Sequence, residues 1–599
     1  MPSLTSRRAT AIAALVAALV FANALLNGWA GDDVLILRDN ARVHSLAAAF
    51  AARFLPYWPP PWDSAGLYRP LAIFSYAVDW ALGGGGAAAG YGLWIFHTGN
   101  VALHVLAVIL VVRVALAWLS PLAALVAGLV FAVHPVHVEA VANIVGRAEL
   151  LAACGVLGAV LLARRYRDAA RDGAAAAWLG ATVLVVVLAM LCKEHAIIAT
   201  AVIAVDHWLD RSPAARRMFP LYAGLAAVTL GWLHVWGSIA GPYVATGATT
   251  AFHGLTRFQQ VATMLPVQLD VLRLLAWPLD LASDYSPQTT ALQAGLTVGG
   301  VVGLVAMAAL VALGLLARRP APVVAFGILV AAGSYAPTSN IFFTSGVVLA
   351  ERALYLAVLA PALVLGWLSE SQRGTSHHRL MMAAMGVLLV VFSGRTWTRT
   401  PYWETPQTEI IENAGDHPEN YRARIHLGDL LASKGDTARA LAEYLAAEAL
   451  SVSDPFNILY VINSGVALGW HNLAIAYAWK SNRLAPGDHR PSRWLVQALL
   501  AAGLPDSAVA VARAAAMEHQ RSAPHLDTYV LALDQAGARR QARLIGVASL
   551  DWLTGDIVGA SATLDSLGAR PDCPDLEIGR LVVLALRPIW AQMCSFSYP

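Results

Sequence analysis

The stretch ATAIAALVAALVFANALL, residues 9–26, decides the fold of this chain. A membrane-spanning helix needs about 20 mostly apolar residues, and this run comes close to that length without a charged side chain. Hydrophobic residues make up 58% of the 599 residues and charged residues 13%, against roughly 45–50% and about 25% in soluble domains. The sequence therefore predicts an integral membrane protein. Its net charge of +3 gives no support to nucleic-acid binding.

Further apolar runs bring the predicted number of membrane spans to about eleven. The runs are 9–26, 92–118, 122–133, 150–163, 174–191, 196–208, 221–239, 292–317, 322–336, 353–368 and 381–393. Basic clusters such as Arg7-Arg8, Arg164-Arg165 and Arg318-Arg319 fall at every second turn. The positive-inside rule assigns these turns to the cytoplasm. We therefore expect a protein of the cytoplasmic membrane with its N-terminus inside and its C-terminus outside. A cleaved signal peptide is the competing interpretation of the first run, which is longer than the usual core of about 7–15 residues.

The composition changes near residue 413, where apolar runs shorten and charges return. Glycines stand at 435, 469, 503 and 537, so that each follows the last by 34 residues, and an alanine lies five residues after each glycine. This is the period of tetratricopeptide repeats, in which the glycine suits the turn between two helices and the alanine suits their close crossing. A chance helical array is the alternative. We predict an all-α protein, with a membrane domain over 1–400 and an extracytoplasmic tetratricopeptide solenoid over 401–599 that holds a peptide or partner.

Four cysteines are divided between the two predicted domains. Cys154 and Cys192 lie in or beside spans, whereas Cys573 and Cys594 share the exported tail. A disulfide between Cys573 and Cys594 and two free thiols are both compatible with an extracytoplasmic location.

Most polar residues of the predicted membrane domain fall in the outer turns, directly after spans or between them. Charges near a bilayer are costly, so each is a candidate for function. The adjacent carboxylates Asp32 and Asp33 come first, and we expect the others to line one cavity at the outer face. These others are Arg69, His97, His134, His137, Glu139, Arg147, Glu149, Lys193, Glu194, Asp284, Tyr285, Asn340, Glu351 and Arg352.

Several of these segments together resemble the transmembrane and tetratricopeptide-repeat O-mannosyltransferases. The similar segments include Gly31-Asp32-Asp33, Tyr68-Arg69-Pro70-Leu71, Phe96-His97-Thr98-Gly99-Asn100, His134-Pro135-Val136-His137-Val138-Glu139, Gly146-Arg147-Ala148-Glu149, Lys193-Glu194, Ser283-Asp284-Tyr285, Ser339-Asn340 and Ala350-Glu351-Arg352. The resemblance implies a membrane fold of the GT-C glycosyltransferase type. It also implies transfer of a mannose-like sugar from a polyprenyl-phosphate donor to an acceptor, with an acidic residue of the first outer loop acting near the acceptor hydroxyl.

Chemistry assigns these residues compatible roles. Transfer to a serine or threonine hydroxyl needs a base, and either carboxylate of the acidic pair can serve, with Asp32 favoured by the resemblance. The leaving phosphate develops negative charge that Arg69, Arg147, Lys193 and Arg352 can stabilise, and attack from the face opposite the phosphate inverts the anomeric centre. The other residues of the outer turns are expected to contact substrate.

Other interpretations of the same residues remain open. The acidic pair can be part of a solvated loop or a helix cap. The Arg147–Glu149 and Glu351–Arg352 pairs can be structural ion pairs. Lys193-Glu194 can be an anchor at the membrane interface, and His97 can be a packing residue. No cofactor is required, although His134, His137 and Glu139 are weak candidates for a divalent metal site. For the whole protein the alternatives are a membrane scaffold that recruits envelope partners through its repeats, and a transporter. Transporters often keep their ionisable residues near the bilayer midplane.

Overall fold

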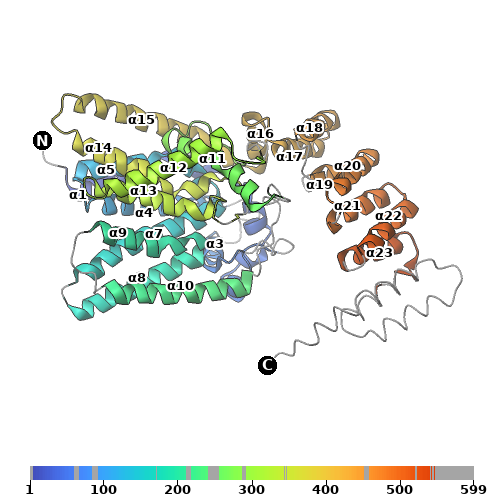
Figure 1. The fold of residues 1–599 in the computed structure, drawn as a ribbon, viewed down its shortest axis with the longest axis horizontal. Helices are drawn as coiled ribbons and strands as arrows, with labels where there is room; N and C mark the ends of the chain where they lie inside the picture. The colour runs from blue at the N-terminus through green and yellow to red at the C-terminus, as the bar shows by residue number, and fades with distance from the viewer. Residues whose placement is uncertain are drawn as a thin grey trace. The chain divides into compact units, whose positions relative to one another are not determined.

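The computed structural model shows a chain built of helices, drawn in Figure 1. The structure describes residues 4–59, 67–83, 92–169, 171–210, 218–240, 252, 255–285, 292–342, 344–345, 347–450, 458–486, 488–519, 523–539, 541–542 and 546. No β-strand occurs within these ranges. The predicted all-α class is therefore confirmed for the described part of the chain. Cys573 and Cys594 lie outside the described residues.

Contacts divide the chain into two units, with the division between Ala423 and Arg424. The first unit contains α1 (Ser6–Val20), α2 (Leu46–Ala51), α3 (Pro70–Leu82), α4 (Leu93–Ala115), α5 (Pro121–Val133), α6 (Val138–Ala142), α7 (Arg147–Asp168), α8 (Asp172–Cys192), α9 (Ala199–Leu209), α10 (Phe219–Ala240), α11 (Arg257–Ala276), α12 (Val298–Ala317), α13 (Pro322–Tyr335), α14 (Leu359–Ser371), α15 (His378–Arg399) and α16 (Pro406–Asp416). Helix α17 (Tyr421–Ser433) begins in the first unit and continues into the second.

Among the described residues of the first unit, seven helical segments are long and apolar enough to cross a membrane by length and composition, as expected for a membrane protein. An eighth is obtained if α5 and the segment Pro135–Ala142, which bend by 49° at His134, form one broken span. Three further apolar helices are shorter, and they begin at Pro70, Pro322 and Leu356. The count of eleven spans therefore stays a prediction. Helices α3 and α11 lie inside segments that the sequence analysis assigned to outer turns.

Small residues allow the apolar helices of the first unit to pack closely. A Cβ atom on Gly366 of α14 would lie 2.8 Å from the carbonyl oxygen of Ala123 on α5, and one on Gly155 of α7 would overlap Ala189 of α8. Small side chains at such crossings let helix backbones approach, which is the packing mode that membrane helices favour. These contacts hold the helices whose ends carry the candidate site.

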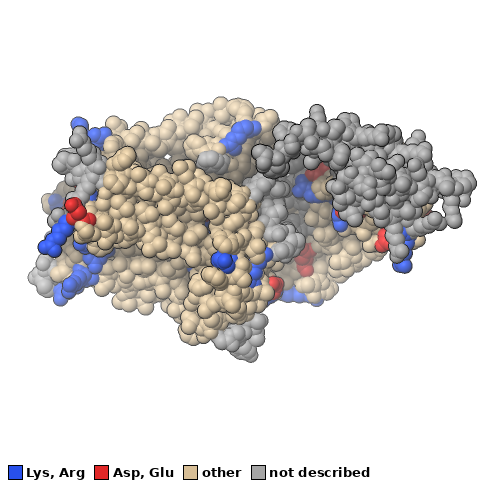
Figure 2. Space-filling model, turned by 90° about the horizontal axis from the view of Figure 1, so that it is seen from below, with Lys and Arg blue, Asp and Glu red and all other residues tan. Residues whose placement is uncertain are grey.

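Large apolar side chains cover much of the outer surface of the first unit. On α12, Leu304, Val305 and Leu313 are each at least half exposed. Figure 2 shows a face on which a broad area carries few charged side chains. Such apolar surface is expensive in water and is the kind of surface that lipid covers.

The described part of the second unit contains consecutive helices. After α17 come α18 (Thr437–Leu450), α19 (Ile458–Ala467), α20 (His471–Leu484), α21 (His489–Ala501), α22 (Pro505–Glu518) and α23 (Ala523–Gln535). The four glycines of the 34-residue period have φ values between 71° and 84°, the left-handed conformation that only glycine adopts without strain.

The same hydrogen bond closes each of these turns. The residue after the glycine donates its N–H to a carbonyl five residues earlier, as from Leu504 to Leu499 at 2.9 Å, which is the Schellman arrangement at a helix end. The alanines five residues after the glycines are at most 4% exposed. Glycine and alanine thus occupy the environments predicted for them, while the assignment as a tetratricopeptide solenoid stays a prediction.

Candidate active site

The acidic loop, Gly31-Asp32-Asp33, follows the first membrane span and its short 3-10 extension, Ala22–Leu26. Gly31 has a φ of 51° and turns the chain back towards the bundle. Asp33 is fully buried, and its carboxylate accepts backbone N–H bonds from Val145 at 2.8 Å and Ile144 at 3.2 Å. Burial raises the pKa of Asp33 to about 7, against the opposing effect of these backbone donors. The structure therefore uses Asp33 to fix the acidic loop on the segment that precedes α7.

Asp32 differs from its neighbour in exposure and in partner. Its side chain is 39% exposed, and its Oδ2 lies 3.7 Å from Nη2 of Arg352. No other ion pair or hydrogen bond engages its side chain within the described ranges. Of the two carboxylates, Asp32 is the one that an incoming molecule can reach.

Arg352 connects Asp32 to a buried carboxylate of α6. Its Nη1 lies 3.1 Å from Oε1 of Glu139, and its backbone N–H donates to Oε2 of the same side chain at 2.8 Å. Burial alone would lower the pKa of Arg352, but the charges of Glu139, Asp32 and Glu149 outweigh burial and raise the pKa above its usual value. The guanidinium is therefore held as a permanent cation beside the accessible carboxylate.

Two more cations lie near Arg352: Lys193 interacts electrostatically with both Arg352 and Arg69. Lys193 forms an ion pair with Glu149, and Arg69 donates to Glu194 at 2.8 Å. Burial lowers the pKa of Lys193 to about 8, opposed by Glu149 and reinforced by the positive charges of Arg69 and Arg352. The structure thus brings Arg69, Lys193 and Arg352 together with their carboxylate partners. We call these three cations the cation cluster.

Arg147, the fourth predicted cation, donates hydrogen bonds to groups of the protein itself. It forms an ion pair with Asp79 of α3 and donates to Asn100 Oδ1 at 2.8 Å and to the carbonyl of Phe96 at 2.7 Å. Asn100 in turn donates to the carbonyl of Asn143 at 3.0 Å. Arg147 therefore ties α3, α4 and the start of α7 to one another.

The buried histidines make separate contacts with the backbone. His97 Nε2 lies 3.3 Å from the carbonyl of Gly28, His134 Nε2 lies 3.2 Å from that of Leu275, and His137 Nε2 lies 3.1 Å from that of Tyr355. Glu139 faces Arg352 instead of these rings. Throughout the described ranges no three His, Cys, Asp or Glu residues converge as metal ligands. The His134 and His137 rings lie 5.8 Å apart between centroids, but Glu139 is paired with Arg352, so the three candidates do not converge as one ligand set.

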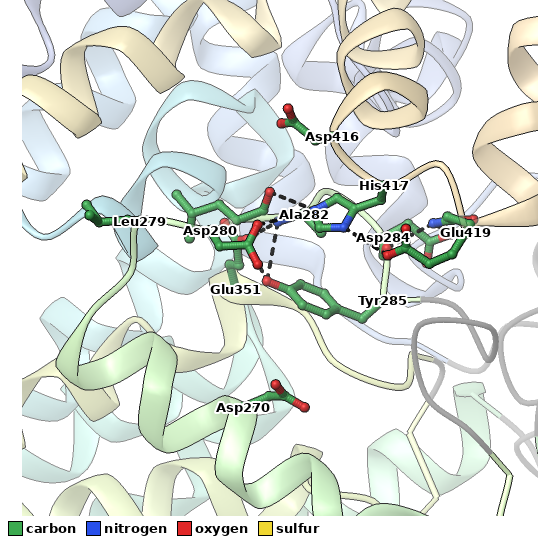
Figure 3. Close-up of polar contacts among 12 residues, drawn as sticks. Asp270, Leu279, Asp280, Ala282, Asp284, Tyr285, Glu351, Asp416, His417 and Glu419 are labelled. Carbon is green, nitrogen blue, oxygen red and sulfur yellow. Dashed lines mark hydrogen bonds and ion pairs between the residues drawn. The ribbon is translucent and has the colours of Figure 1, made fainter.

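Glu351 lies beside Arg352 in sequence but binds a different segment, shown in Figure 3. Its Oε1 accepts from the Tyr285 hydroxyl at 2.9 Å and from the backbone N–H of Ala282 at 2.6 Å. Burial raises the pKa of Glu351 to about 8, with Arg399 opposing the shift and Glu139 adding to it. Glu351 therefore fixes the segment 282–285 against the residue that precedes Arg352.

The segment 281–284 is held from its other side by residues just before and within α17. His417 Nε2 lies 3.1 Å from the carbonyl of Leu281, and Arg422 forms an ion pair of 3.1 Å with Asp284 (Figure 3 shows the His417 contact). Asn340, with a φ of 56°, organises its own loop by donating to the carbonyl of Val347 at 2.8 Å. Asp284, Tyr285 and Asn340 thus have defined protein partners.

Sequence reasoning missed three groups that the structure places around these residues. Asp79 pairs with Arg147, Tyr57 lies under the guanidinium of Arg69 with 5.0 Å from ring centroid to Cζ, and Glu409 of α16 faces Gly31. None of the three lies in a motif or a periodic pattern. Only the tertiary structure brings them to the site.

Comparison with known proteins finds relatives of one kind. The chain is 25% identical over 494 residues to the Protein O-mannosyl-transferase TMTC3 of Mus musculus, covering 76% of this chain and 52% of the relative. It is 26% identical over 430 residues to TMTC4 of Homo sapiens, covering 63% and 57%. It is 37% identical over 195 residues to Tmtc2 of Drosophila melanogaster, covering 32% and 20%.

The chain spans about half the length of the TMTC3 proteins that it matches. No family model matches the chain, and no solved structure is significantly similar to it. The relatives nevertheless carry one name, and their similarity extends over most of this chain. The resemblance predicted from the motifs is therefore confirmed, and the chain is related in sequence to the TMTC protein O-mannosyl-transferases.

Proposed function

We propose that the chain is a membrane glycosyltransferase that moves a mannose-like sugar from a polyprenyl-phosphate donor to a hydroxyl group, in proteins a serine or threonine. The observation that carries the proposal is the position of Arg352 between the accessible Asp32 and the buried Glu139, with Lys193 interacting electrostatically with both Arg352 and Arg69. An acidic group that can act on the acceptor thus lies beside cations that can bind the donor phosphate. The names of the relatives support the same reaction.

On the acceptor side, Asp32 is the general base of the proposal. Its exposed carboxylate takes the hydroxyl proton while the hydroxyl oxygen attacks the anomeric carbon. Asp33 suits this task less well, because its oxygens already accept backbone N–H bonds and no water or acceptor can replace them without moving residues 144–145. Positioned general bases contribute about 10²–10⁴-fold to rate.

On the donor side, the cation cluster stabilises the departing lipid phosphate. The bond from the anomeric carbon to the phosphate oxygen breaks with its electron pair on the phosphate, and the developing charge is offset by Arg69, Lys193 and Arg352. Each cation is pre-positioned by a carboxylate, so little reorganisation accompanies the charge transfer. Attack opposite the phosphate inverts the anomeric centre. Arg147 contributes through its contacts with Asp79, Asn100 and Phe96, which hold the start of α7.

The proposal extends to the whole chain. We place a GT-C bundle of about eleven spans in the cytoplasmic membrane, its N-terminus inside and the acidic loop outside, because the basic residues fall in alternate turns. The helices of the second unit, with their 34-residue period, form a tetratricopeptide solenoid that presents protein acceptors. In this proposal the membrane domain, predicted over residues 1–400, also takes in residues 401–423, whose contacts lie in the first unit.

Purified protein incubated with polyprenyl-phosphate mannose and a serine- and threonine-rich peptide tests the reaction, with mass spectrometry of peptide and lipid as readout. Wild-type protein should add one hexose to the peptide, and Asp32→Asn should reduce the rate at least about 100-fold. Asp39→Asn is the matched control, since Asp39 lies in the same outer segment with a half-exposed side chain paired to Arg38. Equal rates for Asp32→Asn and wild type would remove Asp32 from the mechanism.

A further inference from the structure

Glu409 stands on α16, beyond the last predicted span and outside every motif of the sequence. Helix α16 starts at Pro406, and Thr405 caps it by accepting the N–H of Thr408 at 3.0 Å. This cap fixes the first turn of the helix, which carries Glu409. The position of the side chain therefore follows from a well-defined helix start.

The carboxyl group of Glu409 faces the acidic loop. A Cβ atom built on Gly31 would lie 3.2 Å from Glu409 Oε2, and Gly31 directly precedes Asp32. The two segments are joined by their backbones, because the N–H of Gly28 donates to the carbonyl of Glu404 at 2.8 Å. The Asn27 side chain adds a bond of 3.0 Å to the carbonyl of Thr400. These hydrogen bonds hold the segments that carry Glu409 and Asp32 next to each other.

Unlike Asp32 and Asp33, the Glu409 side chain has no hydrogen-bond or ion-pair partner among the described residues. Burial, together with the negative charges of nearby carboxylates, raises its pKa to about 8. These neighbours are Asp32, Asp33, Glu139 and Asp284, and the hydroxyl of Tyr402 also faces the group. Near neutral pH the group is a neutral acid with a free donor and a free acceptor, and it is only partly covered.

We propose that Glu409 is a positioning residue for the acceptor, whose carboxyl group donates a hydrogen bond to a carbonyl oxygen of the acceptor peptide beside Asp32. The inference rests on the proposed transferase function. Glu409 keeps its proton during transfer, while Asp32 receives the proton of the acceptor hydroxyl. A peptide acceptor suits this role because a carbonyl oxygen adjoins every serine or threonine, and a neutral acid is a stronger donor to it than water.

Transfer rates at increasing peptide concentration, with Glu409→Gln and Glu409→Leu in the full chain, test this role. Glu409→Gln keeps a neutral donor of the same length and should leave the peptide KM within about threefold. Glu409→Leu keeps the size but removes the donor, and should raise the peptide KM about tenfold or more with kcat within about threefold. Glu412→Leu, an exposed position on the same helix, is the control and should match wild type.

The pH dependence of the peptide KM distinguishes this role from a purely structural one, which would not change it. In wild type the peptide KM should rise above about pH 8, because Glu409 loses its proton there, whereas Glu409→Gln should show no such rise. An unchanged KM in Glu409→Leu, or the same rise in Glu409→Gln, overturns the assignment while the transferase function stands. If Glu409→Leu fails to fold, the pH profile of Glu409→Gln decides alone. Wild-type protein without transfer activity overturns both proposals.

Discussion

Asp32 and Asp33 are adjacent in sequence, but their surroundings give them different tasks. A fully buried carboxylate that accepts backbone N–H bonds stabilises structure, whereas an exposed one beside an arginine is available for chemistry. The sequence alone offers two equivalent carboxylates here, because nothing local tells which will be covered. The difference arises from residues 144–145, more than a hundred positions away.

Asp33 should make stability depend on pH in a defined direction. Its pKa is about 7 in the folded protein against 3.8 for a free side chain, so the folded state binds more protons than the unfolded state between these values. The free energy of unfolding should therefore decrease as pH rises through this window and become level above it. Asp33→Asn should lack this contribution. Melting of both proteins in detergent from pH 4 to 8 measures it, and equal slopes would contradict it.

Arg352 should not tolerate replacement by lysine. A guanidinium meets Asp32 and Glu139 with two different nitrogens, whereas an ammonium is a single point charge on a shorter reach. Arg352→Lys is expected to lower the transfer rate at least about tenfold while the protein still folds. Arg38→Lys, at an exposed pair in the same outer segment, serves as the control and should retain activity.

At the scale of elements, close helix crossings should be sensitive to small added side chains. Gly155→Val forces a side chain into Ala189 of the neighbouring helix, and overpacking of this kind typically costs about 1–3 kcal/mol. Gly180→Val on α8 meets no atom within 4 Å and should change the melting temperature little. Equal shifts in the two variants would show that the α7–α8 crossing does not limit stability.

The ion pair between Asp284 and Arg422 should couple the segment 281–285 to the start of α17. Both side chains are partly exposed, so a double-mutant cycle with Asp284→Asn and Arg422→Gln should give a coupling of about 0.5 kcal/mol or less in stability. We expect a larger effect on transfer, because the same segment holds Glu351 next to Arg352. Additive effects on the transfer rate would argue against coupling through this segment.

The extent of prediction from sequence follows from the range of the interactions. Apolar runs and the 34-residue period depend on local order, so the helical class and the glycine turns were predictable. Helices α3 and α11 lie between the predicted spans, and Asp79 in α3 and Asp270 and Arg273 in α11 interrupt their apolar sequences. The grouping of the cations depends on contacts between residues far apart in sequence. The same holds for the hydrogen bond from Arg147 to Asn100. Such contacts leave no periodic signal.

At the scale of the molecule, the division after Ala423 guides truncation. Residues 401–423 include Glu409, His417 and Arg422, whose contacts lie in the first unit. A chain that ends after Ser433 should therefore keep the stability of the first unit and cleave its lipid donor. A chain that ends after Thr400 should melt at a lower temperature. A stable, active protein of the shorter length would show that α16 is dispensable.

The contacts of the acidic loop also set an order of events during biosynthesis. The loop emerges from the ribosome early, yet its carboxylate anchor lies at residues 144–145 and its backbone anchor at Glu404. Until α15 and the turn that follows it have been made, the acidic loop lacks its anchor at Glu404 and is held by the contacts of Asp33 with residues 144–145. For the proposed transferase, activity is therefore expected only once Glu404 and the last span of the first unit are in place.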